Sequence, residues 1–283
     1  MLRTKRFIIP GLMMTNQSKT QTAFRLFVLF SLVLVLAIAG CSRQTDEDDG
    51  RTAEEMYEWA KTSLDSGNWS EAVRRYRMLN SRYPFGRHAE QSQLDMAYAF
   101  HRARQPDAAL SALDRFIRTY PTHPNVDYAW YLKGLVHYEE AMGFIRRIFP
   151  GQIKDRDQES ARAAFNDFQE LVRQHPESRY VPDARQRMVF LRNAMAEYEV
   201  TVGEYYERRG ARIAAVNRAK YVLENYPGAP ATYDALVLME RNYEKLGMDD
   251  LAMDTRRVRE HNYPDGVGEE DPGGFFSRLW PFN

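Results

Sequence analysis

The sequence predicts an all-α protein, and three observations carry that prediction. The residues after position 50 show almost no strand-like alternation of apolar and polar side chains but a strong helical period. A tripeptide that ends in proline recurs five times along this part of the chain. A small residue stands at one fixed distance before each of these prolines. Together these features indicate pairs of helices repeated and stacked along the chain.

The recurring tripeptides mark the ends of helices. They are Arg82-Tyr83-Pro84, Thr119-Tyr120-Pro121, Gln174-His175-Pro176, Asn225-Tyr226-Pro227 and Asn262-Tyr263-Pro264, with prolines 37, 55, 51 and 37 residues apart. An apolar helical stretch precedes each proline, which cannot continue a helix because it has no amide proton to donate. Each unit is therefore predicted to be a helix–turn–helix whose second helix ends at the proline.

Positions inside the units also match. An alanine lies twelve residues before each proline, at Ala72, Ala109, Ala164, Ala215 and Ala252. A small residue lets two helices approach closely, and larger residues four and seven positions later fill the same helix face. Gly67, Gly210 and Gly247 lie at the expected turn between paired helices, where a left-handed backbone favours glycine. The fifth unit has arginines at the later positions, which is typical of a terminal unit with one face in solvent.

This pattern is that of the tetratricopeptide repeat, and we predict a superhelical solenoid of about five repeats over residues 53–265. The repeats are expected at about 53–86, 90–123, 126–178, 183–229 and 233–265. Repeat three is extended, because Gly143–Asp157 interrupts it between helices predicted at Val126–Met142 and Glu159–Gln174. Repeat four is extended by a long first helix from near Asp183 to Arg209.

The amino-terminal leader indicates export and lipidation. Residues 1–40 carry five basic and no acidic side chains, and end in the uncharged run from Leu26 to Gly40. That run is shorter than the roughly 20 residues of a membrane span but suits a signal peptide. It ends in Ile38-Ala39-Gly40-Cys41, which resembles the lipobox of bacterial lipoproteins. The resemblance implies cleavage before Cys41 and attachment of acyl chains to its thiol and new amino group.

The chain is accordingly divided into four parts. Residues 1–40 are predicted to be a lipoprotein signal peptide, with Met13 and Met14 as alternative starts. Residues 41–52 are the lipidated Cys41 and a flexible polar linker, followed by the solenoid. Residues 266–283 are predicted to be a flexible tail, acidic at first and ending in Phe-Phe-Ser-Arg-Leu-Trp-Pro-Phe-Asn.

The composition points to binding rather than chemistry. The 39 basic and 39 acidic side chains balance, so charge gives no case for nucleic acid as a partner. A single cysteine excludes an internal disulfide and a multi-cysteine metal site. The six histidines are scattered, and no phosphate-binding, metalloprotease or serine-hydrolase motif occurs. We therefore expect no metal, no cofactor and no enzymatic activity, and a solenoid face that binds peptides or protein domains.

Several loop and helix segments resemble the BamD family of outer-membrane protein assembly factors. They include Gly67-Asn68-Trp69, Asn80 to Gly86, Asp114 to Arg118, Pro121 to Asn125, Asp155 to Asp157, Tyr198 to Ala211 and Val216-Asn217-Arg218. The resemblance covers roughly residues 25–262. It includes loop residues that a generic tetratricopeptide repeat does not require, which makes it specific.

The resemblance implies a non-enzymatic subunit of the β-barrel assembly machine, anchored to the outer membrane by its acyl chains and facing the periplasm. It implies that the amino-terminal repeats receive unfolded β-barrel proteins, with Tyr83, Phe85 and Gly86 in the segment that contacts substrate. It also implies that the carboxy-terminal repeats bind a POTRA domain of the BamA-like barrel subunit, through Asn217 and Arg218. It further implies that accessory Bam lipoproteins join the assembly.

Two other functions remain open from the sequence. One is a secretin pilotin or pilus-assembly lipoprotein, which also combines a lipobox with tetratricopeptide repeats. The other is a general periplasmic holdase that binds many unfolded proteins without forming a stoichiometric complex.

Overall fold

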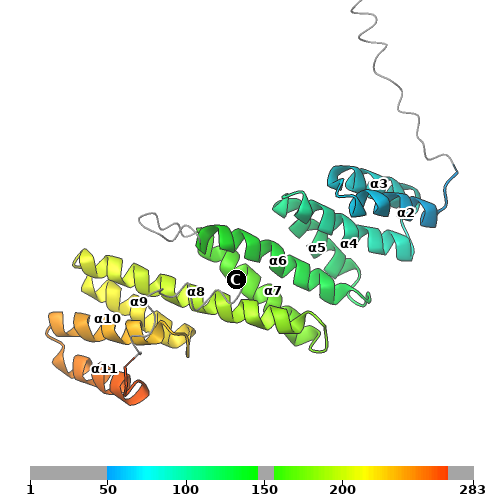
Figure 1. Ribbon diagram of the computed structural model, residues 1–283. Helices are drawn as coiled ribbons and strands as arrows, with labels where there is room; N and C mark the ends of the chain where they lie inside the picture. The colour runs from blue at the N-terminus through cyan, green and yellow to red at the C-terminus, as the bar shows by residue number, and fades with distance from the viewer. Residues whose placement is uncertain (1–49, 146–155, 267–283) are drawn as a thin grey trace, which may run out of the picture. The chain divides into compact units, whose positions relative to one another are not determined.

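The structure is a computed structural model that describes residues 50–145 and 156–266. Within these ranges the chain forms ten helices and no strand. They are α2 (Ala53–Asp65), α3 (Trp69–Arg82), α4 (Arg87–Arg102), α5 (Pro106–Thr119), α6 (Val126–Ile145), α7 (Arg156–Gln174), α8 (Val181–Arg208), α9 (Arg212–Asn225), α10 (Thr232–Lys245) and α11 (Asp249–Asn262). They pack as five consecutive pairs, from α2 with α3 to α10 with α11 (Figure 1). The predicted all-α tetratricopeptide fold is confirmed; Cys41 and the predicted tail after Gly266 lie outside the described residues.

Packing follows the order of the chain. Each helix contacts the next one, and the first helices of neighbouring pairs also touch, α2 with α4, α4 with α6 and α8 with α10. The recurring alanines are buried at these contacts, with no exposed area in four pairs and 4% exposure at Ala252. Tyr76, Leu113 and Phe168, four residues after their alanines, are also fully buried. Burying a side chain of this size stabilises the fold by about 1.5–3 kcal/mol, so the predicted face is the core.

The turns within the pairs use one backbone position in the left-handed region. Gly67, Gly210 and Gly247 have φ angles of +77°, +76° and +72° at that position. In the second pair Arg104 takes the same place with φ +56°, and it is the one non-glycine residue with a positive φ among those described. A side chain in this region strains the backbone, so the turn geometry prevails here over the preference of the residue.

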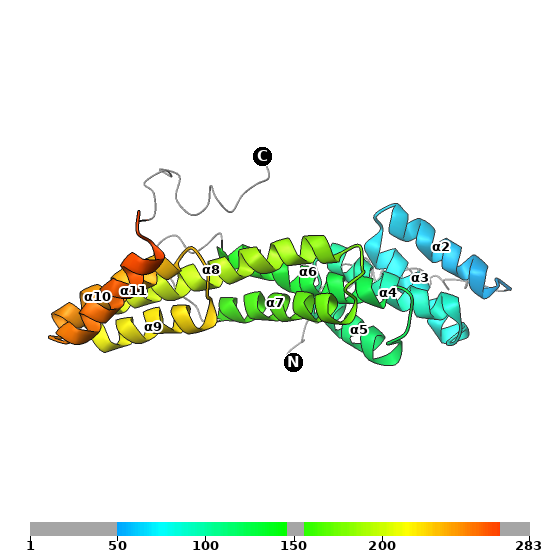
Figure 2. The ribbon, with the colours of Figure 1, turned by 90° about the horizontal axis from the view of Figure 1, so that it is seen from below.

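The extended repeats differ in detail from the prediction. α6 continues to Ile145 and α7 begins at Arg156, so the interruption between them is shorter than expected and falls on residues outside the described ranges. α8 begins at Val181, because Pro182 fits the first turn of a helix, where no amide donor is needed. Its 28 residues span about 42 Å, and α8 packs on α7, α9 and α10 (Figure 2).

The last pair ends the stack with charged side chains. Arg256 and Arg259 replace the large apolar residues of earlier pairs, and both guanidinium groups reach Glu240 on α10, at 2.6 and 2.9 Å. Arg256 also contacts Glu244 at 2.6 Å. Charged side chains at these two positions are typical of a terminal repeat, as the sequence predicts.

Two helices approach each other closely at Gly134. A Cβ atom built there would lie 2.5 Å from Cε1 and 2.6 Å from Cδ1 of the Phe168 ring on α7, well inside van der Waals contact. Because Phe168 is fully buried, its ring has no free space to move into. Gly134 therefore sets the distance between α6 and α7.

We predict that Gly134→Ala lowers the free energy of unfolding by about 1–3 kcal/mol, because the core must shift to admit one methyl group. Urea unfolding followed by circular dichroism measures this loss. Combining Gly134→Ala with Phe168→Leu removes the clashing ring, so the double variant loses less than the sum of the two single losses. Strict additivity would show that the ring and the glycine do not set the helix distance.

Candidate binding surfaces

The loop between α3 and α4 contains the three residues predicted to contact substrate. Tyr83 ends α3, and its backbone N–H donates to the Leu79 carbonyl at 2.7 Å. Its ring packs on the core of the first repeat. Tyr120, Tyr226 and Tyr263 end their helices with nearly the same φ, between −127° and −136°. Tyr83 therefore has a structural role that recurs in the fold.

Phe85 and Gly86 differ from this repeated pattern. The Phe85 side chain is 89% exposed, the highest value among the exposed large apolar residues of the described chain. Gly86 precedes the first residue of α4 with φ +98°, a conformation that side chains rarely adopt. The Phe85 ring is therefore surrounded by water and makes almost no buried contact within its own fold. It is available to an apolar side chain of another molecule.

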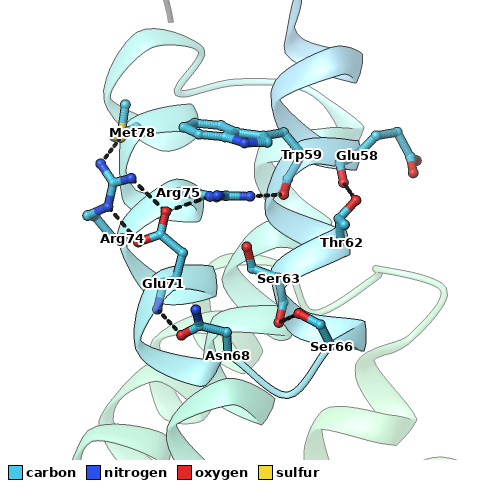
Figure 3. Close-up of polar contacts among 10 residues, drawn as sticks. All are labelled: Glu58, Trp59, Thr62, Ser63, Ser66, Asn68, Glu71, Arg74, Arg75 and Met78. Carbon is cyan, nitrogen blue, oxygen red and sulfur yellow. Dashed lines mark hydrogen bonds and ion pairs between the residues drawn. The ribbon is translucent and has the colours of Figure 1, made fainter. Parts of the chain in front are cut away.

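A network of hydrogen bonds and ion pairs joins α3 to α2 in the same repeat (Figure 3). Glu71 accepts two hydrogen bonds from Arg74, at 2.6 and 2.8 Å, and one from Arg75 at 2.7 Å. The bonds from Arg74, and to a smaller extent that from Arg75, lower the pKa of Glu71 to about 2. The Arg75 guanidinium stacks 4.0 Å from the centre of the Trp59 ring and donates to the Trp59 carbonyl at 2.9 Å. Glu71 thus stays ionised, and with the two arginines it forms a group of net charge +1.

A second polar centre joins the first three helices, and no sequence pattern indicated it. Asp95 on α4 accepts from the Tyr57 hydroxyl on α2 at 2.8 Å and from the Tyr76 hydroxyl on α3 at 3.0 Å. Gln91 donates to its other oxygen at 2.9 Å. Burial and the Asp95 charge raise the pKa of both tyrosines well above 10, so the hydroxyls remain donors. The network links α2 with α3, and the Asp95 centre links both of these helices with α4.

The predicted partner-binding residues lie on α9, and the structure separates them. Asn217 is exposed. The Arg218 side chain, 41% exposed, donates from Nη1 to Glu199 Oε2 on α8 at 2.8 Å, and the Glu199 side chain is only 1% exposed. Two α7 residues approach the other Glu199 oxygen, Gln158 at 3.4 Å and Arg162 at 3.9 Å. Arg218 is therefore the main counter-ion of a buried carboxylate, a role that the sequence reasoning missed.

A second buried carboxylate lies between α6 and α7. Asp167 on α7, with 8% side-chain exposure, contacts Lys133 at 3.2 Å and His137 Nδ1 at 2.7 Å, both on α6. Lys133 also reaches Asp114 on α5 at 2.9 Å. Each of these side chains therefore has a partner within the fold. No group of three or more histidine, cysteine, aspartate or glutamate side chains suited to hold a metal occurs in the described ranges.

An open cleft of about 520 Å³ lies between the loop after α5 and the loop after α7. Its lining includes Thr122, His123, Asp127 and His175, and the Ser178 hydroxyl donates to Asp127 across it at 2.7 Å. These loops follow their helices as the Phe85 loop follows α3, but they present polar side chains. Of these three loops, only the one after α3 carries an exposed large apolar side chain.

We predict that Arg218→Ala lowers the free energy of unfolding by about 2 kcal/mol, because it leaves Glu199 buried with only the distant Arg162 as counter-ion. The loss is measured by urea unfolding. Glu199→Gln added to Arg218→Ala removes the unpaired charge and recovers part of that stability. If Arg218→Ala costs no more than Lys220→Ala, an exposed control on the same helix, the ion pair is not structural.

Comparison with known proteins agrees with this architecture and extends along most of the chain. The family described as "YfiO: Outer membrane lipoprotein" matches residues 49–258. Relatives named outer membrane protein assembly factor BamD include that of Neisseria meningitidis, 42% identical over 84% of this chain and 91% of its own length. Those of Xylella fastidiosa and Vibrio cholerae are 40% and 36% identical over 83% of this chain, and over 80% and 97% of their own lengths.

Solved structures resemble the chain more distantly. The crystal structure of MamA is 16% identical over 72% of this chain and 95% of its own, with a TM-score of 0.30. A kinesin light chain of Podosopora anserina with tetratricopeptide-like repeats is 13% identical over 74% and 95%, with a TM-score of 0.33. The sequence relatives decide the family: this chain belongs to the YfiO family of outer membrane lipoproteins, together with the BamD assembly factors.

Proposed function

We propose that the protein is a scaffold and substrate-recognition subunit of the β-barrel assembly machine, acting at the periplasmic face of the outer membrane. The observation that carries this proposal is the 42% identity to a BamD assembly factor along 84% of the chain. The geometry supports a binding role, since repeated helices offer surface for other proteins. In this role the protein promotes folding and insertion of barrel proteins by holding them beside the barrel subunit.

The anchor is proposed to be Cys41, which lies outside the described residues. No helix in the described part of the chain is long and apolar enough to cross a membrane. The proposal of acyl-chain attachment rests on the lipobox-like Ile38-Ala39-Gly40 that precedes Cys41. Two or more acyl chains anchor a protein stably, whereas one gives only marginal binding.

We predict that Cys41→Ala moves the protein out of the outer-membrane fraction and abolishes its labelling with a radioactive fatty acid. Cell fractionation and metabolic labelling measure the two effects. Ser42→Ala, one position further along, serves as the control and leaves both unchanged. Retention of the acyl label in the Cys41→Ala chain would rule out this anchor.

Unfolded barrel proteins are proposed to meet the chain at the loop of Phe85. The exposed ring gives an apolar contact, and the hydrogen bond from Tyr76 to Asp95 joins α3 and α4, the helices on either side of the loop. An aromatic side chain near the carboxy-terminal end of a substrate strand can pack on such a ring, a contact worth about 0.5–1.5 kcal/mol beyond area burial. Tyr83 supports the loop from within, and Gly86 lets it turn.

We predict that a photoreactive residue at position 85 crosslinks to the carboxy-terminal peptide of a barrel protein. The same residue at position 122, which is equivalent in the next repeat, labels much less, because that loop is polar. Mass spectrometry of the crosslinked products measures both yields. Equal labelling at the two positions would leave Phe85 without a role in recognition. Phe85→Ala, which removes no buried contact, should weaken peptide binding while stability is unchanged.

The barrel subunit is proposed to bind the carboxy-terminal repeats through a POTRA domain, at the surface around Asn217 and Arg218, with accessory lipoproteins joining the assembly. The exposed face of Arg218 is available for a second carboxylate while its inner face holds Glu199. Asn217 is better suited than Arg218 to test this contact. Because Asn217 is exposed, replacing it can change binding of the partner without changing the stability of the fold. Replacement of Asn217 by Arg should weaken binding of the barrel subunit in a pull-down and leave the unfolding midpoint unchanged.

A further inference from the structure

Exposed apolar side chains gather at the last helix of the described chain. Within residues 50–145 and 156–266, eight large apolar residues are exposed, and four of them lie within residues 248–258. Met248, Leu251 and Val258 are 40%, 45% and 49% exposed. Their spacing of three and seven residues places them along one side of α11, and we call these three residues the α11 stripe.

The residues that follow α11 have a composition that matches this stripe. The described chain ends at Gly266, four residues after α11, and the sequence continues for seventeen residues to Asn283. Its last part, residues 275–282, contains five large apolar side chains, namely Phe275, Phe276, Leu279, Trp280 and Phe282. The proposed assembly role uses neither this segment nor the stripe.

We propose that residues 275–282 fold back and pack on the α11 stripe, as a cover that the terminal repeat otherwise lacks. The lengths permit this arrangement. The 14 residues of α11 rise by about 21 Å, and the eight residues 267–274 can span up to about 26 Å. Phe275 can therefore reach any point along the helix. Because both parties belong to one chain, their effective concentration is in the millimolar range, which favours the tail over a second molecule.

Charge supports the antiparallel direction of that return. The first half of α11 carries Asp249, Asp250 and Asp254, and the second half carries Arg256, Arg257 and Arg259. The tail has the opposite order: Glu269, Glu270 and Asp271 come first and Arg278 follows. A tail that runs back along α11 places its acidic residues at the arginine end and its arginine at the aspartate end. At the arginine end Arg256 and Arg259 already contact Glu240 and Arg257 contacts Asp254, so the tail would add to existing ion pairs. Opposite charges would then lie side by side at both ends of α11. Such charge pairs set the direction in which the tail runs along the helix more than they strengthen its binding.

The test places a photoreactive residue at position 276 of the full-length, membrane-anchored protein and maps the products by mass spectrometry. The expected product is an internal crosslink to α11 around Leu251 and Val258. Val258→Asp should reduce its yield about tenfold, because a carboxylate would have to be buried beneath the aromatic segment. Glu260→Gln is the matched control, since position 260 lies about 200° around the helix from position 258 and should not affect the yield.

Hydrogen exchange provides a second measurement that does not depend on a variant of α11. The α11 amides should exchange several-fold faster in Trp280→Ser than in the unaltered chain, because the cover is then weakened. Crosslinks between two chains, crosslinks mainly to another protein, or crosslinks spread evenly over the surface would each overturn the proposal. Exchange that is identical in the two proteins would overturn it as well. A failure of the assembly role leaves both readouts unchanged.

Discussion

The contact between a small residue on one helix and a large side chain on its neighbour is the constraint on which the structure depends. One pair of helices cannot bury its apolar face alone, so each pair needs the next. At each pair an alanine with almost no exposed area lets the backbones approach, and between α6 and α7 a glycine brings the Phe168 ring against the opposite helix. Larger residues at these points would separate the helices and open the core along the chain.

Polar groups in the core add specificity to this packing. Three buried or half-buried carboxylates, Asp95, Asp167 and Glu199, each collect donors from helices that are distant in sequence. An apolar face tolerates small shifts of one helix along another, whereas a carboxylate with fixed donors does not. Glu199 matters most in this respect, because it joins α7, α8 and α9 at the long helix where repeats three and four meet.

Features that recur with the repeat were predictable from the sequence. Hydrogen bonds and ion pairs between particular side chains on different helices were not. The prolines, the alanines and the turn glycines recur at fixed register, so the sequence alone identifies helix ends, contacts and turns. Arg218 shows the limit of that reasoning, because its partner Glu199 is nineteen residues away on another helix and no repeat position marks the pair. The exposure of Phe85 could be anticipated, because an aromatic residue after the helix end departs from the other repeats. Arg104 departs as well, but its register alone did not reveal a left-handed turn without glycine.

In a stack of repeats, candidate binding residues that belong to different repeats lie at different places along the stack. The first repeat exposes the Phe85 ring, and the fourth exposes part of Arg218, whose guanidinium group also pairs with the buried Glu199. Such a division suits a scaffold that holds a substrate at one place and a permanent partner at another. A holdase would instead have contacts spread over many repeats and would form no fixed complex.

The most direct test is to purify the protein from bacterial membranes in mild detergent and determine its partners and their ratios by quantitative mass spectrometry. We expect one outer-membrane barrel subunit with POTRA domains in a fixed stoichiometry with this chain, together with accessory lipoproteins. Recovery of a secretin in fixed stoichiometry, or of many unfolded proteins with no fixed ratio and no barrel subunit, would contradict the account.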